Sequence, residues 1–294
     1  MNDNERFSQK HIILFSFLIG IVFLLLFGFG IITQILTIFL PGEILFIPGM
    51  GYLLSAINNF IAFILLIIIL KRIDLFNNIS WNFKGVKKGL ILGVPLIIFT
   101  LVQMYLIFDA APDKSIVISL IPIINAVIYC ISIGLWEETL CRGLFLTNML
   151  KKWGNTKKGI IKSIVLSSMI FGILHIISAI NGNLISSLIQ VAYASIMGIL
   201  LAVIYIKTKS LWSAIILHII LNFAAYLMPF LVPNSVGMDQ GLFIIILILF
   251  NLVFLIYSYF IIINIKVEDV QSFLNHKNKS IDDFNSNNFI IKNE

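Results

Sequence analysis

Residues 116–147 read IVISLIPIINAVIYCISIGLWEETLCRGLFLT, an apolar run whose only charged residues are Glu137, Glu138 and Arg142. A helix needs about 20 mostly apolar residues to cross a bilayer, and this run exceeds that length. Charged side chains are costly inside a membrane and usually serve a function where they occur. The run therefore predicts both a membrane-spanning helix and a functional site on it.

The rest of the chain has the same apolar character. Of its 294 residues, 60% are hydrophobic and 12% are charged, whereas a soluble domain has about 25% charged residues. The predicted membrane helices cover residues 12–39, 51–70, 89–109, 116–147, 160–180, 184–206, 211–232 and 241–265. A re-entrant or interfacial segment is the alternative for any one of them, above all for 184–206. We expect an all-α fold, a polytopic membrane bundle of about eight transmembrane helices.

The positions of the basic residues support this count. They gather before the first predicted helix, in the second, fourth and sixth connections, and after the last helix. The other connections hold one lysine beside acidic residues. Because cytoplasmic loops carry an excess of Lys and Arg, we expect a multi-pass protein of the cell membrane with both termini in the cytoplasm. The same loops account for the net charge of +6, so we do not expect nucleic-acid binding.

Composition also predicts how the chain is divided. Residues 1–267 are expected to form a single transmembrane bundle, and residues 268–294, rich in Asn, Asp, Lys and Ser, a disordered cytoplasmic tail. The first apolar run is too long for a signal peptide, so we expect it to stay as the first helix. Cys130 and Cys141 would lie about 16 Å apart on one helix, which is too far for a disulfide. Frequent Ile, Asn and Lys residues favour a bacterial source.

The two neighbouring glutamates differ in their surroundings. Glu138 and Arg142 are four residues apart and share a helix face, with the acidic residue first, which is the more favourable order. We interpret this pair as a structural ion pair. Glu137 points about 100° away and has no basic residue on its face. A carboxylate buried without a partner favours its protonated form, so Glu137 is predicted to accept a proton.

Two later runs carry the remaining polar residues. Phe171 and His175 are four residues apart, and so are His218 and Asn222. Taken singly, such residues more often satisfy core hydrogen bonds or join membrane helices. Counted at 1.5 Å per residue from the basic loops, however, Glu137 and both histidines lie about 10 to 20 Å deep. A base, two imidazoles and an amide in one layer suit hydrolysis by an activated water, with donors for the oxyanion.

The three motifs E-E-x-x-x-R, F-x-x-x-H and H-x-x-x-N, in this order on separate predicted membrane helices, resemble a known family. It is the CPBP (or Abi) family of membrane proteases, which includes the CAAX prenyl endopeptidases and the bacteriocin-processing or immunity proteins. The resemblance covers residues 116–230, the expected protease core. It implies an intramembrane endopeptidase that acts on a membrane-associated protein or peptide.

The resemblance also implies roles for single residues. Glu137 and His175 would activate a water molecule, and His218 and Asn222 would stabilise the oxyanion. Three other residues would have structural or supporting roles, namely Glu138, Arg142 and Phe171. The expected partners are the lipid bilayer and a membrane protein or peptide substrate.

A metal ion is the main open question for this chemistry. A catalytic zinc site usually has three protein ligands, and Glu137, His175 and His218 could supply them. The glutamate mechanism needs no ion, and the H-E-x-x-H zinc motif is absent from the sequence. We therefore expect no cofactor, with zinc as the alternative.

Two other functions compete with proteolysis. The first is a non-proteolytic membrane scaffold, or a bacteriocin self-immunity protein, of the same fold. The second is a transporter or proton pathway, because buried Glu and His residues mark those as well. No internal repeat of the kind common in transporters is apparent, so endopeptidase activity is the prediction that the motifs favour.

Overall fold

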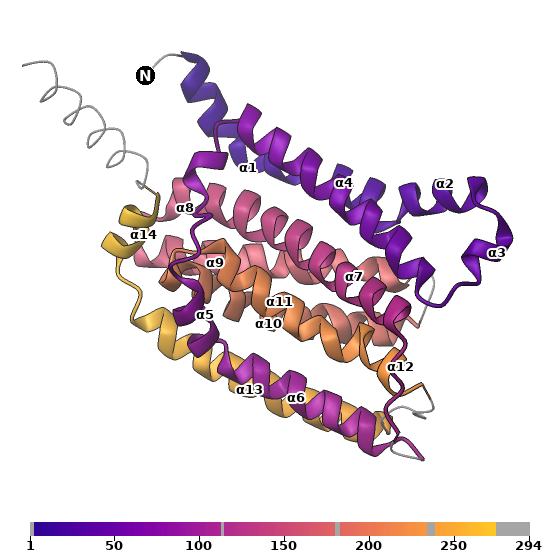
Figure 1. Ribbon diagram of the computed structural model, residues 1–294. Coiled ribbons are helices and arrows are strands. Elements are labelled where there is room, and N and C mark those ends of the chain that lie inside the picture. The colour runs from indigo at the N-terminus through magenta and orange to yellow at the C-terminus, as the bar shows by residue number, and fades with distance from the viewer. Residues whose placement is uncertain (1–2, 113–114, 180–182, 234–238, 275–294) are drawn as a thin grey trace, which may run out of the picture.

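The predicted membrane segments are built mainly of helix in the computed structural model (Figure 1). The structure describes residues 3–112, 115–179, 183–233 and 239–274, and these ranges contain no strand. The longer helices are α1 (Asp3–Phe23), α2 (Ile31–Phe39), α4 (Met50–Arg72), α5 (Val86–Leu92), α6 (Val94–Asp109), α7 (Leu120–Glu138), α8 (Thr147–Trp153), α9 (Lys157–Ile173), α10 (Leu184–Thr208), α11 (Leu211–Tyr226), α13 (Gln240–Ile263) and α14 (Val267–Leu274). The short elements are α3 (Gly42–Leu45), α12 (Met228–Leu231), the π-helices η1 (Leu24–Gly28) and η3 (Thr139–Leu146), and the 3₁₀-helices η2 (Phe76–Asn78) and η4 (Leu174–Ala179).

By length and composition, six helical stretches in the described ranges could cross a membrane, and a seventh if α5 and α6, which bend by 63°, form one span. The six are Ile13–Phe39, Met50–Arg72, Leu120–Trp153, Lys157–Ile176, Leu184–Thr208 and Gly241–Ile263. Residues 184–206 thus lie in a full-length apolar helix. The fold is an all-helical polytopic membrane bundle, as predicted.

The seventh predicted segment, residues 211–232, forms a shorter helix than predicted. Helix α11 has 16 residues and ends at Tyr226. A new turn, α12, starts at Met228, with Pro229 in its first positions. Proline has no N–H to donate within a helix, and it disfavours helical geometry in the residue before it. The predicted span is therefore broken near residue 227.

Helix α11 is a central element of the bundle. It contacts α5, α6, α7 and α10, and Figure 1 shows it between α7 and α6. Two further packed pairs are α9 with α10, and α4 with α7. Side chains of α11 are therefore enclosed by neighbouring helices.

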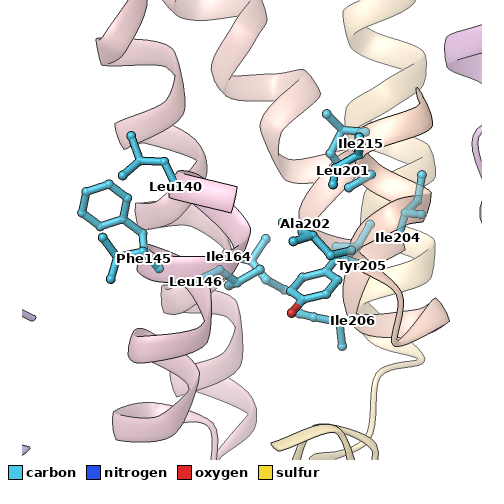
Figure 2. Close-up of a cluster of buried hydrophobic side chains, with 14 of the residues drawn as sticks. Leu140, Phe145, Leu146, Ile164, Leu201, Ala202, Ile204, Tyr205, Ile206 and Ile215 are labelled. Atoms are coloured by element: carbon cyan, nitrogen blue, oxygen red, sulfur yellow. The ribbon is translucent and has the colours of Figure 1, made fainter. Parts of the chain in front are cut away.

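The largest part of the core lies between η3, α9, α10 and α11. Figure 2 shows ten labelled side chains of this cluster, which are Leu140, Phe145, Leu146, Ile164, Leu201, Ala202, Ile204, Tyr205, Ile206 and Ile215. The outward faces are also apolar: Phe39, Phe46 and Ile38, for example, are 76–87% exposed. Apolar surface on this scale is a liability in water but suits contact with lipid.

Basic connections meet at one end of the bundle, where α5, α8 and α14 lie in Figure 1. The Lys157 ammonium donates to the carbonyls of Ile262 and Ile265, and Lys207 donates to the carbonyl of Asn264. Cations at a helix C-terminus bind carbonyls that lack an intrahelical partner. These lysines therefore hold the end of α13 against α9 and α10.

The prediction of disorder from residue 268 onward is wrong for residues 268–274. They belong to α14, where Val270 and Phe273 are fully buried. The Phe273 ring meets the Tyr205 ring edge-on, with 5.0 Å between centroids. The polar composition of this segment did not indicate that it forms a short amphipathic helix, which is buried through Val270 and Phe273. The remainder of the predicted tail, residues 275–294, lies outside the described residues.

Gly172 allows α9 and α10 to approach closely. A Cβ atom built on Gly172 would lie 2.0 Å from Ser195 Oγ and 2.5 Å from the carbonyl oxygen of Val191. The backbone must shift to relieve the second contact, so we expect Gly172→Ala to lower the free energy of unfolding by about 1–3 kcal/mol. Unfolding in mixed detergent micelles measures this change.

Gly51 provides a matched control, because it also lies in a helix and a Cβ there would meet nothing within 4 Å. We expect Gly51→Ala to keep wild-type stability or raise it slightly, since alanine is the better helix former. Equal stability of Gly172→Ala and Gly51→Ala would contradict the close packing of α9 on α10.

Candidate active site

The helix that carries both glutamates changes its pitch directly after them. Helix α7 ends at Glu138 and continues as the π-helix η3, whereas the sequence predicted one regular helix. The backbone N–H and the hydroxyl of Thr147 both donate to the carbonyl of Arg142, five residues earlier. Wide turns of this kind occur often at functional sites, and all of η3 is buried.

Glu138 and Arg142 form a buried ion pair. Arg142 Nη1 lies 2.9 Å from Glu138 Oε1, and both side chains are 0–1% exposed. Arg142 Nη2 also donates to the carbonyl of Gly198 at 3.0 Å, and its guanidinium lies 4.5 Å from the centroid of the Phe171 ring. Additional hydrogen bonds of this kind are what a buried pair requires.

His218 joins this pair from another helix. Its Nδ1 atom lies 2.9 Å from Glu138 Oε1, and its Nε2 atom lies 3.9 Å from Glu137 Oε2. A carboxylate that is paired with Arg142 acts as an acceptor, so His218 Nδ1 donates. The imidazole is therefore held between the two glutamates, with Nε2 directed toward Glu137. The sequence motifs did not indicate the bond between Glu138 and His218, which are 80 positions apart.

Glu137 differs from Glu138 as the sequence indicated. Its side chain is 16% exposed, while that of Glu138 is fully buried. Glu137 Oε2 has no hydrogen-bond partner among the described residues. At 3.9 Å, Glu137 and His218 Nε2 do not hydrogen-bond directly, but one water molecule can contact both atoms.

His175 lies where α9 gives way to η4. Its Nδ1 atom is 2.9 Å from the carbonyl oxygen of Phe171. Because a carbonyl only accepts, Nδ1 carries a proton and donates this bond. The Phe171 ring meets the His175 and His218 rings edge-on, at 5.2 and 5.6 Å between centroids. Phe171 thus orients both imidazoles, in addition to contacting Arg142.

One cavity of about 610 Å³ brings the predicted catalytic residues together. Glu137, His175, His218 and Asn222 all line it. Asn222 Nδ2 is buried and has no hydrogen-bond partner among the described residues. The cavity therefore presents a carboxylate oxygen and an amide donor that protein groups in the described ranges do not satisfy. Its volume is in the range of sites for small ligands or short peptide segments.

The possible zinc ligands do not form a metal site as they stand. In the described ranges, no three His, Cys, Asp or Glu side chains are grouped closely enough to hold a metal ion. Glu137, His175 and His218 share the cavity without making such a group. We therefore derive no chemical step through a metal.

The two cysteines, Cys130 and Cys141, are buried and free.

Comparison with known families identifies this part of the chain. Residues 119–224 match the family described as type II CAAX prenyl endopeptidase Rce1-like. This segment, just over a third of the chain, is similar to the Rce1-like family. The match confirms the predicted family and indicates endopeptidase activity for a protein set in the membrane. Neither the curated proteins nor the solved structures compared with the chain gave a match.

The segment that matches the Rce1-like family provides only part of the cavity. It runs from the residue before α7 to two residues before the end of α11 and contains all three motifs. Other lining residues come from helices outside this segment, namely η1, α2, α4, α6 and α13. The motif residues thus form one part of the cavity lining, and the rest includes parts of the chain that the family match does not reach.

Proposed function

We propose that the chain is an intramembrane endopeptidase that hydrolyses a peptide bond of a membrane-associated protein or peptide with a water molecule activated by a glutamate. The observation that supports this proposal most directly is the position of His218 between Glu138 and Glu137 in the lining of a cavity of about 610 Å³. The match to a family of proteases supports the same reaction class.

In this mechanism Glu137 is the base. A water molecule beside Glu137 Oε2 would lose its proton to this carboxylate and attack the scissile carbonyl carbon. His175, whose ring is held by the bond from Nδ1 to the Phe171 carbonyl, would help to orient the water through Nε2. The proton held by Glu137 then passes to the leaving nitrogen as the C–N bond breaks. The carboxylate is thereby regenerated, and one water is consumed for each bond cleaved.

The negative charge that develops on the carbonyl oxygen needs donors. His218 would supply Nε2–H while Nδ1–H stays bound to Glu138, so the ring carries both protons in this step. Asn222 would supply its unpaired Nδ2. Donors fixed before the reaction stabilise an oxyanion better than water does, because they need no reorganisation. Arg142 acts one step further away, by holding the Glu138 carboxylate that orients His218.

We further propose that the basic end of the bundle faces the cytoplasm, as the excess of Lys and Arg in these connections favours. A fluorescent reporter that is active only in the cytoplasm, fused after residue 274, would test this orientation. Reporter activity is expected there, and its absence would contradict the proposal.

The proposed activity can be tested on the purified protein in detergent micelles. The probe is a fluorescence-quenched peptide that ends in a CAAX sequence, made with and without a farnesyl group on its cysteine. We expect a rise in fluorescence, and mass spectrometry of the products would give the cleaved bond. An absence of cleavage in both peptides, together with identical membrane and secreted peptides in cells with and without the protein, would favour a scaffold or immunity protein.

Replacement of Asn222 tests the oxyanion step separately. We expect Asn222→Ala to lower kcat about 10²- to 10³-fold with little change in KM, because the lost donor acts mainly on the transition state. Asn251→Ala is the matched control: Asn251 is a buried asparagine of α13 whose amide donates to the carbonyl of Leu247, and it does not line the cavity. Equal losses in the two variants would show that Asn222 contributes to stability rather than to the reaction.

A further inference from the structure

Helix α4, which packs beside α7 and lies outside the segment that matches the family, carries a polar group of the cavity. Asn58 lies on α4, lines the cavity and is 2% exposed. Its Nδ2 atom donates to the carbonyl of Phe27 at 3.1 Å and to Asn59 Oδ1 at 3.3 Å. Asn59 Nδ2 in turn donates to Ser132 Oγ on α7 at 3.2 Å. This chain of bonds fixes the amide of Asn58 in one orientation.

The orientation leaves an acceptor without a donor. Asn58 Oδ1 is buried and has no hydrogen-bond partner among the described residues. Exchanging the two ends of the amide would place its oxygen against the Phe27 carbonyl, so the assignment follows from the bonds of Nδ2. An unpaired buried acceptor destabilises the protein. It is an advantage where a ligand brings the missing donor.

The position of Asn58 relative to the reaction can be estimated. Gly49 lies against Pro122, and Asn59 bonds to Ser132, so α4 and α7 run in the same direction. Ser132 precedes Glu137 by five residues, and Asn58 lies one residue further back. The axial separation of Asn58 from Glu137 is therefore about 9 Å. An extended peptide covers this distance with about two to three residues.

We propose that Asn58 is a substrate-binding residue whose Oδ1 atom accepts the backbone N–H of a peptide residue two to three positions from the scissile bond. This inference rests on the proposed function and names the substrate as an extended peptide segment rather than a lipid chain alone. Besides Glu137 Oε2, two unpaired polar atoms of the described residues belong to the cavity lining, an acceptor at Asn58 and a donor at Asn222. These two atoms are complementary to the N–H and C=O groups of such a segment. A hydrocarbon chain offers neither group.

The test measures binding without turnover. In the Glu137→Gln protein, the dissociation constant of the farnesylated CAAX peptide is measured by fluorescence anisotropy. The measurement is repeated with peptides that carry one N-methyl group on each backbone nitrogen in turn. At one position, two to three residues from the scissile bond, N-methylation is expected to weaken binding about 3- to 10-fold, the effect of one neutral hydrogen bond.

Asn58→Leu, in the same background, should weaken the binding of the unmodified peptide by a similar factor. It should also remove the effect of that single N-methyl group on binding. Asn251→Leu, outside the cavity, should change neither. Loss of this position-specific sensitivity cannot come from general destabilisation, so it supports the proposal even if Asn58→Leu is less stable. Retained sensitivity in Asn58→Leu, or no saturable binding of the peptide, overturns the proposal. The same binding pattern without any hydrolysis by the wild-type protein would support the subsite while contradicting the proposed function.

Discussion

Glu137→Gln is expected to lower the rate of peptide-bond hydrolysis by about 10³-fold or more, since it removes the group that accepts a proton from the attacking water. Glutamine has nearly the same shape as glutamate. Glu137 makes no hydrogen bond through Oε2 in the described structure, so little of the packing depends on its charge. The fluorescence-quenched CAAX peptide, with wild-type and variant protein in the same detergent, gives the ratio of rates.

The fold of Glu137→Gln should stay intact, with the wild-type unfolding temperature. Glu268→Gln is the matched control, because it makes the same chemical change at an exposed position on α14, outside the cavity. It should retain full activity. Undiminished hydrolysis by Glu137→Gln would exclude Glu137 as the base and leave the histidines as the remaining candidates.

Local features of the sequence, namely apolar runs, loop charges and residue spacing, were sufficient to predict a helical membrane bundle. Apolar runs correctly located six of the eight predicted membrane helices as full-length stretches, since length and hydropathy decide whether a segment suits a bilayer. They did not show the bend between α5 and α6 or the break after α11. The alternation of basic and non-basic connections predicted that the basic ones lie at one end of the bundle. Lys157 and Lys207, from two different connections, both bind carbonyls at the end of α13. Spacing of four residues also predicted that Glu138 pairs with Arg142 while Glu137 stands apart. These features depend on local geometry, which a sequence reveals directly.

Features that depend on contacts between distant residues were missed. The bond of His218 to Glu138 links α11 to α7, and no spacing rule connects positions so far apart. The π-helix after Glu138 was also missed, because its apolar sequence suits a regular helix equally well. Asn58 lies in an apolar segment that the motifs did not include, and only the cavity shows what it faces. The sequence thus indicated which single residues belong to the candidate site, but it did not indicate the hydrogen bonds and packing contacts that join them.

Arg142→Met is expected to lower the free energy of unfolding by about 3–5 kcal/mol, the usual cost of leaving one partner of a buried ion pair without the other. The change removes the bonds of the guanidinium to Glu138 and to the carbonyl of Gly198, and its contact with Phe171. Methionine fills much of the same volume, so the effect of charge dominates. Unfolding in mixed detergent micelles measures the loss.

The partly exposed pair of Lys207 and Asp269, 3.8 Å apart, is the matched control. Asp269→Asn, which removes the charge from this pair and leaves Lys207 bound to the carbonyl of Asn264, should cost less than about 1 kcal/mol, because ion pairs exposed to water contribute little.

A double replacement separates the two roles of the buried pair. Glu138→Leu combined with Arg142→Met removes both charges, and apolar residues of similar volume often replace a buried pair at little cost. Stability should therefore return toward the wild-type value. Hydrolysis should not return, because His218 Nδ1 would have lost the carboxylate that orients the ring. A stable Arg142→Met protein would contradict the buried charge pair. A stable double variant with wild-type activity would show that Glu138 does not position His218 for the reaction.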